Sequence, residues 1–212
     1  MTFRQTEKMK IMAKTDPRVI KTLRHIDDAL IDNLRNHAFR KITVDMICRS
    51  AMINRSTFYK YYSDKYELLD NYLSRVMKEF EEATASTDFI LASPYTISDQ
   101  QYVENFQKTI DYVYEHREVY RILWHSSIDR PIYKEMESII CANILKTIRE
   151  DPAGPHQITP YHTLYAELFS SNLMTMIRWW LSNETRITRS DVLEVMNGNM
   201  KNGLFPTFKY RI

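Results

Sequence analysis

Apolar residues recur at spacings of three and four along most of the chain, which is the repeat of a helix with one buried face. The pair Asp16-Pro17, an N-cap carboxylate before a proline, marks the first helix start. The pattern predicts helices at about 17–36, 44–51, 55–61, 64–80, 100–115, 116–127, 131–150, 160–183 and 188–202. The Ser/Thr-rich segment 85–99 and the breaker 151–155 are predicted loops. The expected fold is therefore all-α, with about nine helices.

Composition excludes several classes of protein. Only three of the 212 residues are glycine, so neither a GxGxxG nor a GxxxxGK phosphate loop is available, and hairpin turns would be hard to supply. Cys48 and Cys141 are too few and too far apart for a disulfide framework or a CxxC metal site, so we expect reduced thiols. No apolar run is long enough for a leader or a membrane span. We therefore expect a cytoplasmic protein with no membrane partner.

Charge is unevenly distributed along the chain. Residues 1–65 contain 14 Lys and Arg against 7 Asp and Glu, a net charge of +7, whereas residues 66–212 contain 15 against 20, a net charge of −5. A basic head on an acidic body is typical of a protein that binds the DNA backbone with one domain only, although a merely solvated basic face would look the same. We expect a DNA-binding domain at 1–65, with ordered helices from about residue 16, and a regulatory and dimerisation domain at 66–212.

The segment 43–65 carries the strongest functional signal. Two short predicted helices, each preceded by an N-cap residue (Thr43 and Asn54), are separated by a turn of three residues. The small Ala51 lets these helices approach closely, and Phe58 packs between them. Helices this short must be held by packing. The arrangement predicts a helix-turn-helix, whose second helix enters the major groove of DNA.

The second short helix presents an outward face that is dense in hydrogen-bond donors. At about 100° per residue, positions 55, 56, 59 and 60 share this face, while Phe58 and Tyr62 turn inward. Hydroxyls and cations suit both phosphate oxygens and base edges. An ordinary helical bundle would explain Phe58 and Tyr62 as core residues, but it would not explain five polar donors on one short helix.

The spacing of these residues matches a known pattern. It consists of Thr43-Val44-x-x-Ile47, Ala51 and Arg55-Ser-Thr-Phe-Tyr59-x-Tyr-Tyr62-x-x-Lys65, preceded by Phe39-Arg-Lys-Ile42. Residues 16–70 thereby resemble the head of tetracycline-repressor-type (TetR-family) regulators, which are bacterial all-α homodimers with a helix-turn-helix head and a ligand-binding, dimerising body. The resemblance implies operator DNA contacts at Thr43, Arg55, Ser56, Thr57, Tyr59, Lys60, Tyr61 and Lys65. Tyr59 and Lys65 would contact the DNA backbone, and Arg55, Thr57 and Lys60 would read bases.

Met52 departs from the family pattern, because the turn between the two helices often has glycine at this position. A positive φ at this site would cost a methionine about 1 kcal/mol or more. We therefore expect the turn to adjust its geometry around Met52.

The body is expected to bind a small-molecule effector and to dimerise. Residues 100–183 are rich in aromatic and methionine side chains, which suit an aromatic or amphipathic ligand but equally an ordinary core or interface. The candidate ligand-binding residues are Phe106, Tyr120, Trp124, His125, Asn172 and Met176. The last two long helices are where the family builds a four-helix dimer interface, and 164–181 carries an apolar stripe. The candidate interface residues are Leu164, Leu168, Ser171, Met174, Ile177 and Leu181.

Together these features predict a DNA-binding transcriptional regulator, a homodimer that represses from a palindromic operator and is released by a small molecule. The alternative is a DNA-binding regulator that is controlled by a protein partner. A compact apolar pocket would favour the first, and an exposed apolar patch on a filled body would favour the second. No GxSxG, HExxH or CxxC motif is present and the six histidines are scattered, so no enzyme activity, metal or cofactor is expected.

Overall fold

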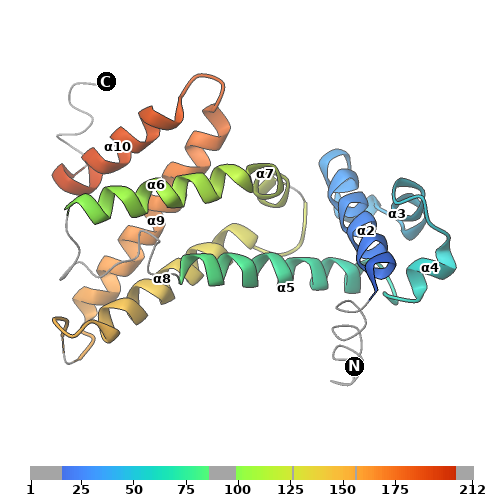
Figure 1. The fold of residues 1–212 in the computed structure, drawn as a ribbon, viewed down its shortest axis with the longest axis horizontal. Helices are drawn as coiled ribbons and strands as arrows, with labels where there is room; N and C mark the ends of the chain where they lie inside the picture. The colour runs from blue at the N-terminus through green and yellow to red at the C-terminus, as the bar shows by residue number, and fades with distance from the viewer. Residues whose placement is uncertain (1–15, 86–98, 126, 156, 204–212) are drawn as a thin grey trace. The chain divides into compact units, whose positions relative to one another are not determined.

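The computed structural model describes residues 16–85, 99–125, 127–155 and 157–203, and all regular structure within these ranges is helical (Figure 1). The elements are α2 (Pro17–Asn36), the 3-10 helix η1 (Phe39–Lys41), α3 (Val44–Ser50), α4 (Arg55–Tyr59), α5 (Lys65–Thr84), α6 (Asp99–Glu115), α7 (Arg117–His125), α8 (Ile132–Glu150), α9 (Pro160–Asn183) and α10 (Arg189–Asn202). The predicted all-α class is confirmed, and each predicted helix is present. Most of the predicted loop 85–99 lies outside the described residues.

Polar side chains fix the starts of the helices that carry the N-terminal motif. The Asp16 carboxylate accepts a hydrogen bond from the Arg18 amide at 2.8 Å, and a proline occupies the first helical position of α2. Asp64 accepts hydrogen bonds from the amides of Tyr66 and Glu67 at 2.8 and 2.9 Å at the start of α5. These caps satisfy amides that have no partner inside the helix.

The described chain forms two compact units. The first contains the described residues up to Met77 together with Ile122–Arg130, and the second contains Lys78–Arg121 together with the described residues from Pro131 onward. α5 therefore contributes to both units. Compactness does not show which part folds alone, so the domain boundary predicted after residue 65 stays a prediction.

The core of the first unit draws on α2, α3, α4 and α5. Its fully buried side chains include Ile26, Leu30, Ile47, Phe58 and Leu73. A polar network also joins these helices, because an Arg75 guanidinium nitrogen lies 2.6 Å from both carboxylate oxygens of Asp27. The same arginine bonds to the buried Tyr62 hydroxyl, whose pKa is raised by burial. Tyr62 is thus a core residue, as its position in the helix repeat predicted.

The second unit is built from the end of α5, from α6, from the start of α7 and from α8–α10, with α8 and α9 lying side by side. Its buried side chains include Phe106, Ile110, Tyr120, Ile140, Met174, Trp180 and Val192. Arg121 ties α7 to the end of α9, since its guanidinium donates to the Leu181 carbonyl at 2.8 Å and lies 2.6 Å from Glu184. Among the described helices, none combines the length and hydropathy that a membrane crossing requires.

Candidate nucleic-acid interface

α3 ends in a tight turn that leads directly into α4. The Ile53 amide donates to the Cys48 carbonyl at 3.0 Å, and the Met52 amide donates to the Arg49 carbonyl at 3.2 Å. These two bonds form a Schellman motif, in which the residue after the helix cap adopts a left-handed conformation. That residue is Met52, with φ of 54°, and the preceding Ala51 is buried. The helix-turn-helix geometry therefore depends on a left-handed methionine.

The expectation that the turn would adjust around Met52 is wrong. The Schellman bonds are both present, and the methionine accepts the left-handed backbone that glycine adopts without strain. Its side chain is 92% exposed, so burial does not offset the conformational cost. The reason is that the two flanking helices fix the turn more strongly than one residue's preference can oppose.

We expect Met52→Gly to raise the free energy of unfolding by about 0.5–1 kcal/mol. Glycine removes a left-handed penalty of about 1–2 kcal/mol, and part of this gain is lost because glycine gives the unfolded chain more freedom. Urea unfolding followed by circular dichroism would measure the change. Met52→Ala is the matched control, since alanine keeps Cβ and its penalty. A glycine variant no more stable than the alanine variant would contradict the conclusion that the left-handed backbone at Met52 costs free energy.

α4 is anchored by one buried residue and exposes most of the others. Phe58 is fully buried, whereas Arg55, Ser56, Tyr59 and Lys60 are exposed, and Thr57 and Tyr61 are half-buried. The outward face is the one that the helix repeat predicted. α4 stops at Tyr59 instead of Tyr61, because the Tyr61 amide bonds back only three residues, to the Phe58 carbonyl at 2.9 Å.

The two N-cap positions of the motif behave differently. The Thr43 hydroxyl accepts from the Met46 amide at 3.2 Å and caps α3 as predicted. Asn54 occupies the cap position of α4, but its side chain makes no capping bond, and its backbone carbonyl accepts from the Thr57 and Phe58 amides at 3.0 and 3.2 Å. The predicted capping role of the Asn54 side chain is therefore wrong. This exposed carboxamide is an extra polar group beside the outward face of α4.

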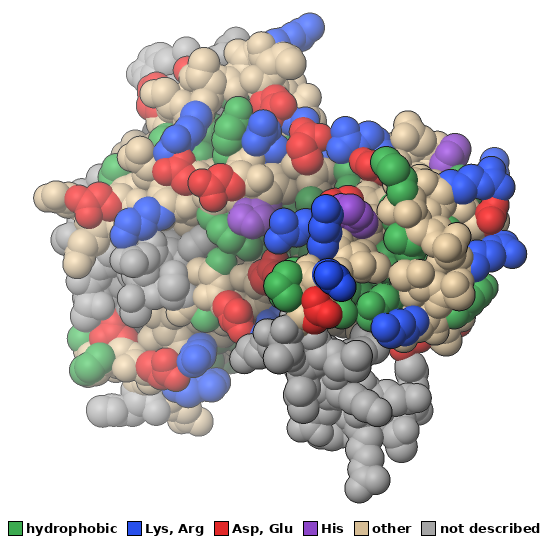
Figure 2. Space-filling view, turned by 45° about the vertical axis from the view of Figure 1, so that its right-hand side comes forward, with side chains coloured by type: hydrophobic (Ala, Val, Ile, Leu, Met, Phe, Trp, Pro, Cys, Tyr) green, Lys and Arg blue, Asp and Glu red, His purple; other side chains and the backbone are tan. Residues whose placement is uncertain are grey.

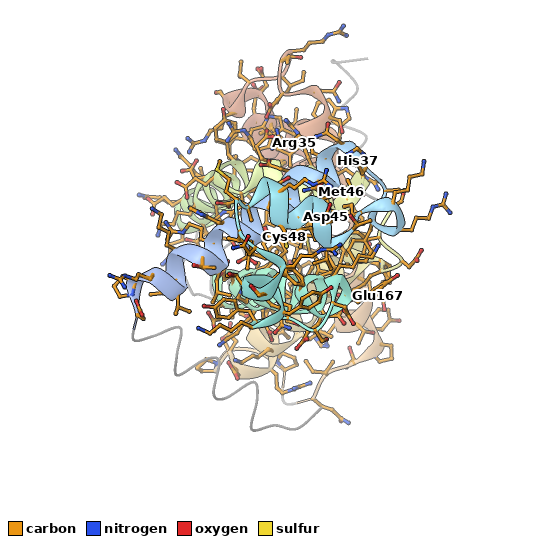
Figure 3. All side chains as sticks on the ribbon, turned by 90° about the vertical axis from the view of Figure 1, so that its right-hand side faces the viewer. Arg35, His37, Asp45, Met46, Cys48 and Glu167 are labelled. Atoms are coloured by element: carbon orange, nitrogen blue, oxygen red, sulfur yellow. The ribbon has the colours of Figure 1, made fainter. Side chains whose placement is uncertain are left out.

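Arg55 is paired with Asp45, a position that the motif pattern leaves unspecified. Its Nε lies 3.5 Å from one carboxylate oxygen of Asp45, and the other oxygen accepts a hydrogen bond from Arg49. Figure 3 looks onto α2–α4 and labels Asp45 and Cys48 on α3. Burial raises the pKa of the Cys48 thiol, and the nearby Arg55 partly opposes that shift. The sequence signal was the i,i+4 spacing of Asp45 and Arg49, which is common on any exposed helix face.

Lys65 has a structural environment that the sequence did not predict. Its ammonium nitrogen donates to the carbonyl oxygens of Phe39, Arg40 and Ile42 at 2.9, 3.2 and 2.6 Å. It also lies 4.8 Å from the centroid of the Phe39 ring and 5.3 Å from that of Tyr66. An ammonium has three N–H donors, and these three carbonyls use all of them. A phosphate contact at Lys65 would have to displace one of these bonds.

The surface around the motif is positively charged. Lys and Arg side chains gather over the part of the molecule formed by α2–α4 (Figure 2). On α4 itself, Arg55 and Lys60 are exposed, and the Lys60 ammonium lies 5.7 Å from the centroid of the Tyr61 ring. Such a face can attract a phosphate backbone, and its hydroxyls and cations can reach base edges.

Comparison with known proteins agrees with this geometry. Residues 100–202 match the family model TetR_C_8, which describes a transcriptional regulator C-terminal region. This match covers the body, and the head carries the motif 43–65 on a helix-turn-helix. Residues 100–202 therefore belong to the TetR family of transcriptional regulators. No curated protein sequence matches the chain.

A solved structure shares the TetR fold of this chain. It is a Clostridium perfringens protein described as a fatty acid metabolism regulator, with 17% sequence identity and a TM-score of 0.59. The alignment covers 85% of this chain and 98% of that protein. At this identity the likeness establishes the fold alone. The family match of residues 100–202 supports a DNA-binding transcriptional regulator, while the contacts of individual residues stay predictions.

The residues predicted to bind an effector fall into three groups. Phe106 and Tyr120 are buried in the second unit, where the Tyr120 hydroxyl donates to the Tyr112 hydroxyl at 3.2 Å. Asn172 and Met176 of α9 meet at Asn199 of α10, whose side-chain amide donates to the Asn172 oxygen at 2.9 Å and lies 3.8 Å from the Met176 sulfur. Asn172 thus joins α9 to α10. Trp124 and His125 belong to the first unit.

The predicted interface residues of α9 divide into three groups by their exposure. Met174, Ile177 and Leu181 are at most 3% exposed within one protomer, so they are core residues with almost no surface to offer a second copy. The half-buried Ser171 donates its hydroxyl to Glu137 at 2.6 Å. Leu164 and Leu168 are exposed, and they share their side of the helix with three aromatic residues. We call the exposed group the α9 face: Tyr161, Leu164, Tyr165, Leu168 and Trp179.

Proposed function

We propose that this TetR-family chain acts as a homodimeric bacterial repressor in the cytoplasm, which binds a palindromic operator with α4 and is released by a small molecule. The observation that carries the proposal is the outward face of α4, where Arg55, Tyr59 and Lys60 are exposed on a helix held by the buried Phe58. A short reading helix contacts only a few bases, so two copies are needed for a specific site. The α9 face supplies an exposed apolar surface for a second copy.

The roles proposed for the motif residues follow from their exposure. Arg55, Thr57 and Lys60 read bases, and Tyr59 contacts the DNA backbone. Thr43, Ser56 and Tyr61 stand at the margins of the same surface, where hydroxyls suit phosphate oxygens. Lys65 is assigned a structural role, because its three N–H donors already have carbonyl partners.

Selection of bound sequences from random duplex DNA tests this function. We expect the wild-type chain to select a motif with two-fold symmetry, and Arg55→Ala to flatten the base preference at one position of each half-site. A good base contact discriminates by about 1–3 kcal/mol, whereas a lost phosphate contact would weaken binding to every sequence alike. Tyr59→Phe is the matched control, because it should weaken specific and random binding by similar factors. Selection of no motif by the wild-type chain would contradict the proposed function.

A small-molecule effector is supported by polar groups inside the second unit. The buried Tyr120 hydroxyl donates to the half-buried Tyr112 hydroxyl at 3.2 Å, and the Asn143 side-chain amide donates to the buried Thr84 hydroxyl at 2.8 Å. Polar groups of this kind orient ligands in apolar sites. Fatty acids are suitable first probes, given the description of the Clostridium perfringens protein. An effector at 100 times its Kd should stabilise the fold by about 2.7 kcal/mol and release DNA.

Control by a protein partner is the second candidate. The observation that favours it is the apolar α9 face, if part of that face stays exposed after dimerisation. A dimer that binds its operator unchanged across ligand probes, and that is released by a purified partner occupying α9, would support this candidate over the first.

A further inference from the structure

The two helices of the helix-turn-helix are bridged by Asp45 of α3 and Arg55 of α4. We propose that Asp45 is a positioning residue, which orients the Arg55 guanidinium so that it reads a guanine in the major groove. The proposal rests on the proposed function and adds to it the base that is recognised and the residue that prepares its recognition.

The two carboxylate oxygens of Asp45 contact two different arginines. Oδ1 lies 3.5 Å from Nε of Arg55, while Oδ2 accepts a hydrogen bond from Arg49, four residues along the same helix. The Arg55 side chain is 62% exposed and that of Asp45 is 36% exposed. The group is therefore open to a ligand approaching from solvent, and it differs from an ion pair that only stabilises a core.

The atom of Arg55 that faces Asp45 determines which donors are left for DNA. Nε is the guanidinium nitrogen nearest the chain, so a contact there leaves the terminal edge, with its two NH2 groups, pointing away from the carboxylate. Guanine presents two neighbouring acceptors, O6 and N7, in the major groove, and they match two parallel donors of an arginine fork. Adenine presents one acceptor and one donor at this edge and would leave one arginine N–H unpaired.

A partner on the neighbouring helix also lowers the entropic cost of reading a base. Arginine has four side-chain torsions, and each one that is restricted before binding need not be ordered by DNA. An exposed ion pair contributes little to folding stability. Removal of the pair should therefore leave the fold intact and change DNA recognition.

The charge of Asp45 has an opposite effect on binding that is independent of sequence. A carboxylate on a surface that meets phosphates repels them and weakens binding to all DNA. Positioning and repulsion therefore predict effects of opposite sign when the charge is removed. Selectivity for guanine should fall while affinity for random DNA rises. Loss of the fold would not produce this combination, because it would lower affinity for all DNA.

Asp45→Asn in the full-length chain tests this, because it keeps the shape of the side chain and removes its charge. Binding would be measured to the selected operator, to the same duplex with adenine replacing the guanine in each half-site, and to a random duplex. We expect the guanine-over-adenine affinity ratio to fall about threefold or more. Affinity for the random duplex should rise about twofold. Asp45→Glu keeps a carboxylate and should retain part of the ratio.

Two further variants separate positioning from other roles of Asp45. In an Arg55→Ala background, Asp45→Asn should leave the base preference unchanged, because Asp45 acts through Arg55. Arg49→Ala is the matched control: it removes the other cation from the same carboxylate and should leave the guanine preference in place. Thermal unfolding of each variant would verify that the fold is retained.

Three results would be decisive. An unchanged guanine-over-adenine ratio in Asp45→Asn would overturn the proposal. A change in preference that persists without Arg55 would also overturn it, because the carboxylate would then read a base directly, such as the amino group of cytosine. If the wild-type chain selected no motif at all, the proposed function itself would fail, and this outcome is recognisable before any variant is made.

Discussion

Leu168→Glu should convert the protein from a dimer to a folded monomer. Leu168 is 62% exposed in a single protomer and lies at the centre of the α9 face, between Tyr165 and Trp179. In a two-fold symmetric interface each substitution occurs twice, so two carboxylates would be buried against apolar side chains. We expect the dimer Kd to rise about 100-fold or more, which corresponds to about 3 kcal/mol. Sedimentation across a concentration series would measure it.

Met174→Glu is the informative comparison, because Met174 lies on the same helix but is 1% exposed within the protomer. A charge at this position has no route to solvent, so the fold itself should lose about 4 kcal/mol or more. The expected result is loss of cooperative unfolding, and a folded monomer is not expected. If Leu168→Glu left the dimer mass unchanged while Met174→Glu gave folded monomers, the interface would lie on the opposite side of α9 from the α9 face.

The helices were predictable because each signal is local in the chain. The apolar repeat from Val19 to Leu34 and the Asp16-Pro17 cap together specify α2, and neither depends on a distant partner. The same holds for α3, whose Thr43 cap lies three residues before its amide partner. Helix ends were less predictable, as the shorter α4 shows, because the last turn depends on competing backbone bonds.

Periodicity could not determine which apolar face of α9 meets its own protomer. Apolar residues occur on two sides of this helix, one containing Met174, Ile177 and Leu181, and the other containing Leu164 and Leu168. Both sides satisfy a helical repeat, and only the positions of neighbouring helices decide which is buried. The sequence therefore predicted the helix α9 itself, but it merged core and surface residues of that helix into one candidate interface.

The motif residues were identifiable, but their partners were not. The outward direction of Arg55 and Lys60 follows from the repeat of one helix and the inward Phe58. The contact between Arg55 and Asp45 crosses the turn at Met52, so it depends on a three-dimensional angle that spacing does not contain. Family resemblance assigned positions to DNA contacts. It did not indicate that one of these residues, Lys65, already donates hydrogen bonds to backbone carbonyls of the protein itself.

Replacement of Lys65 should destabilise the first unit. In Lys65→Met the apolar stem is kept, but three carbonyl oxygens between Phe39 and Ile42 lose their donor. Burial lowers the pKa of the ammonium, and bonds to three carbonyls favour the charged form against that effect. Hydrogen bonds from charged donors contribute about 1.5–3 kcal/mol each when buried, and these are partly exposed. We expect a loss of about 2 kcal/mol in urea unfolding.

Lys65→Arg should rescue stability only in part, because a planar guanidinium cannot direct three donors at carbonyls that converge on a single ammonium. DNA binding then distinguishes a structural lysine from a phosphate contact. A structural Lys65 predicts that Lys65→Met lowers stability and leaves the slope of log K against log salt unchanged. A phosphate contact predicts unchanged stability and a slope smaller by about 1 per protomer, or about 2 per dimer. The exposed Lys60 provides the reference, since Lys60→Met should alter DNA binding with little effect on unfolding. A Lys65→Met variant as stable as the wild type would contradict the structural role and favour a contact between Lys65 and the DNA backbone.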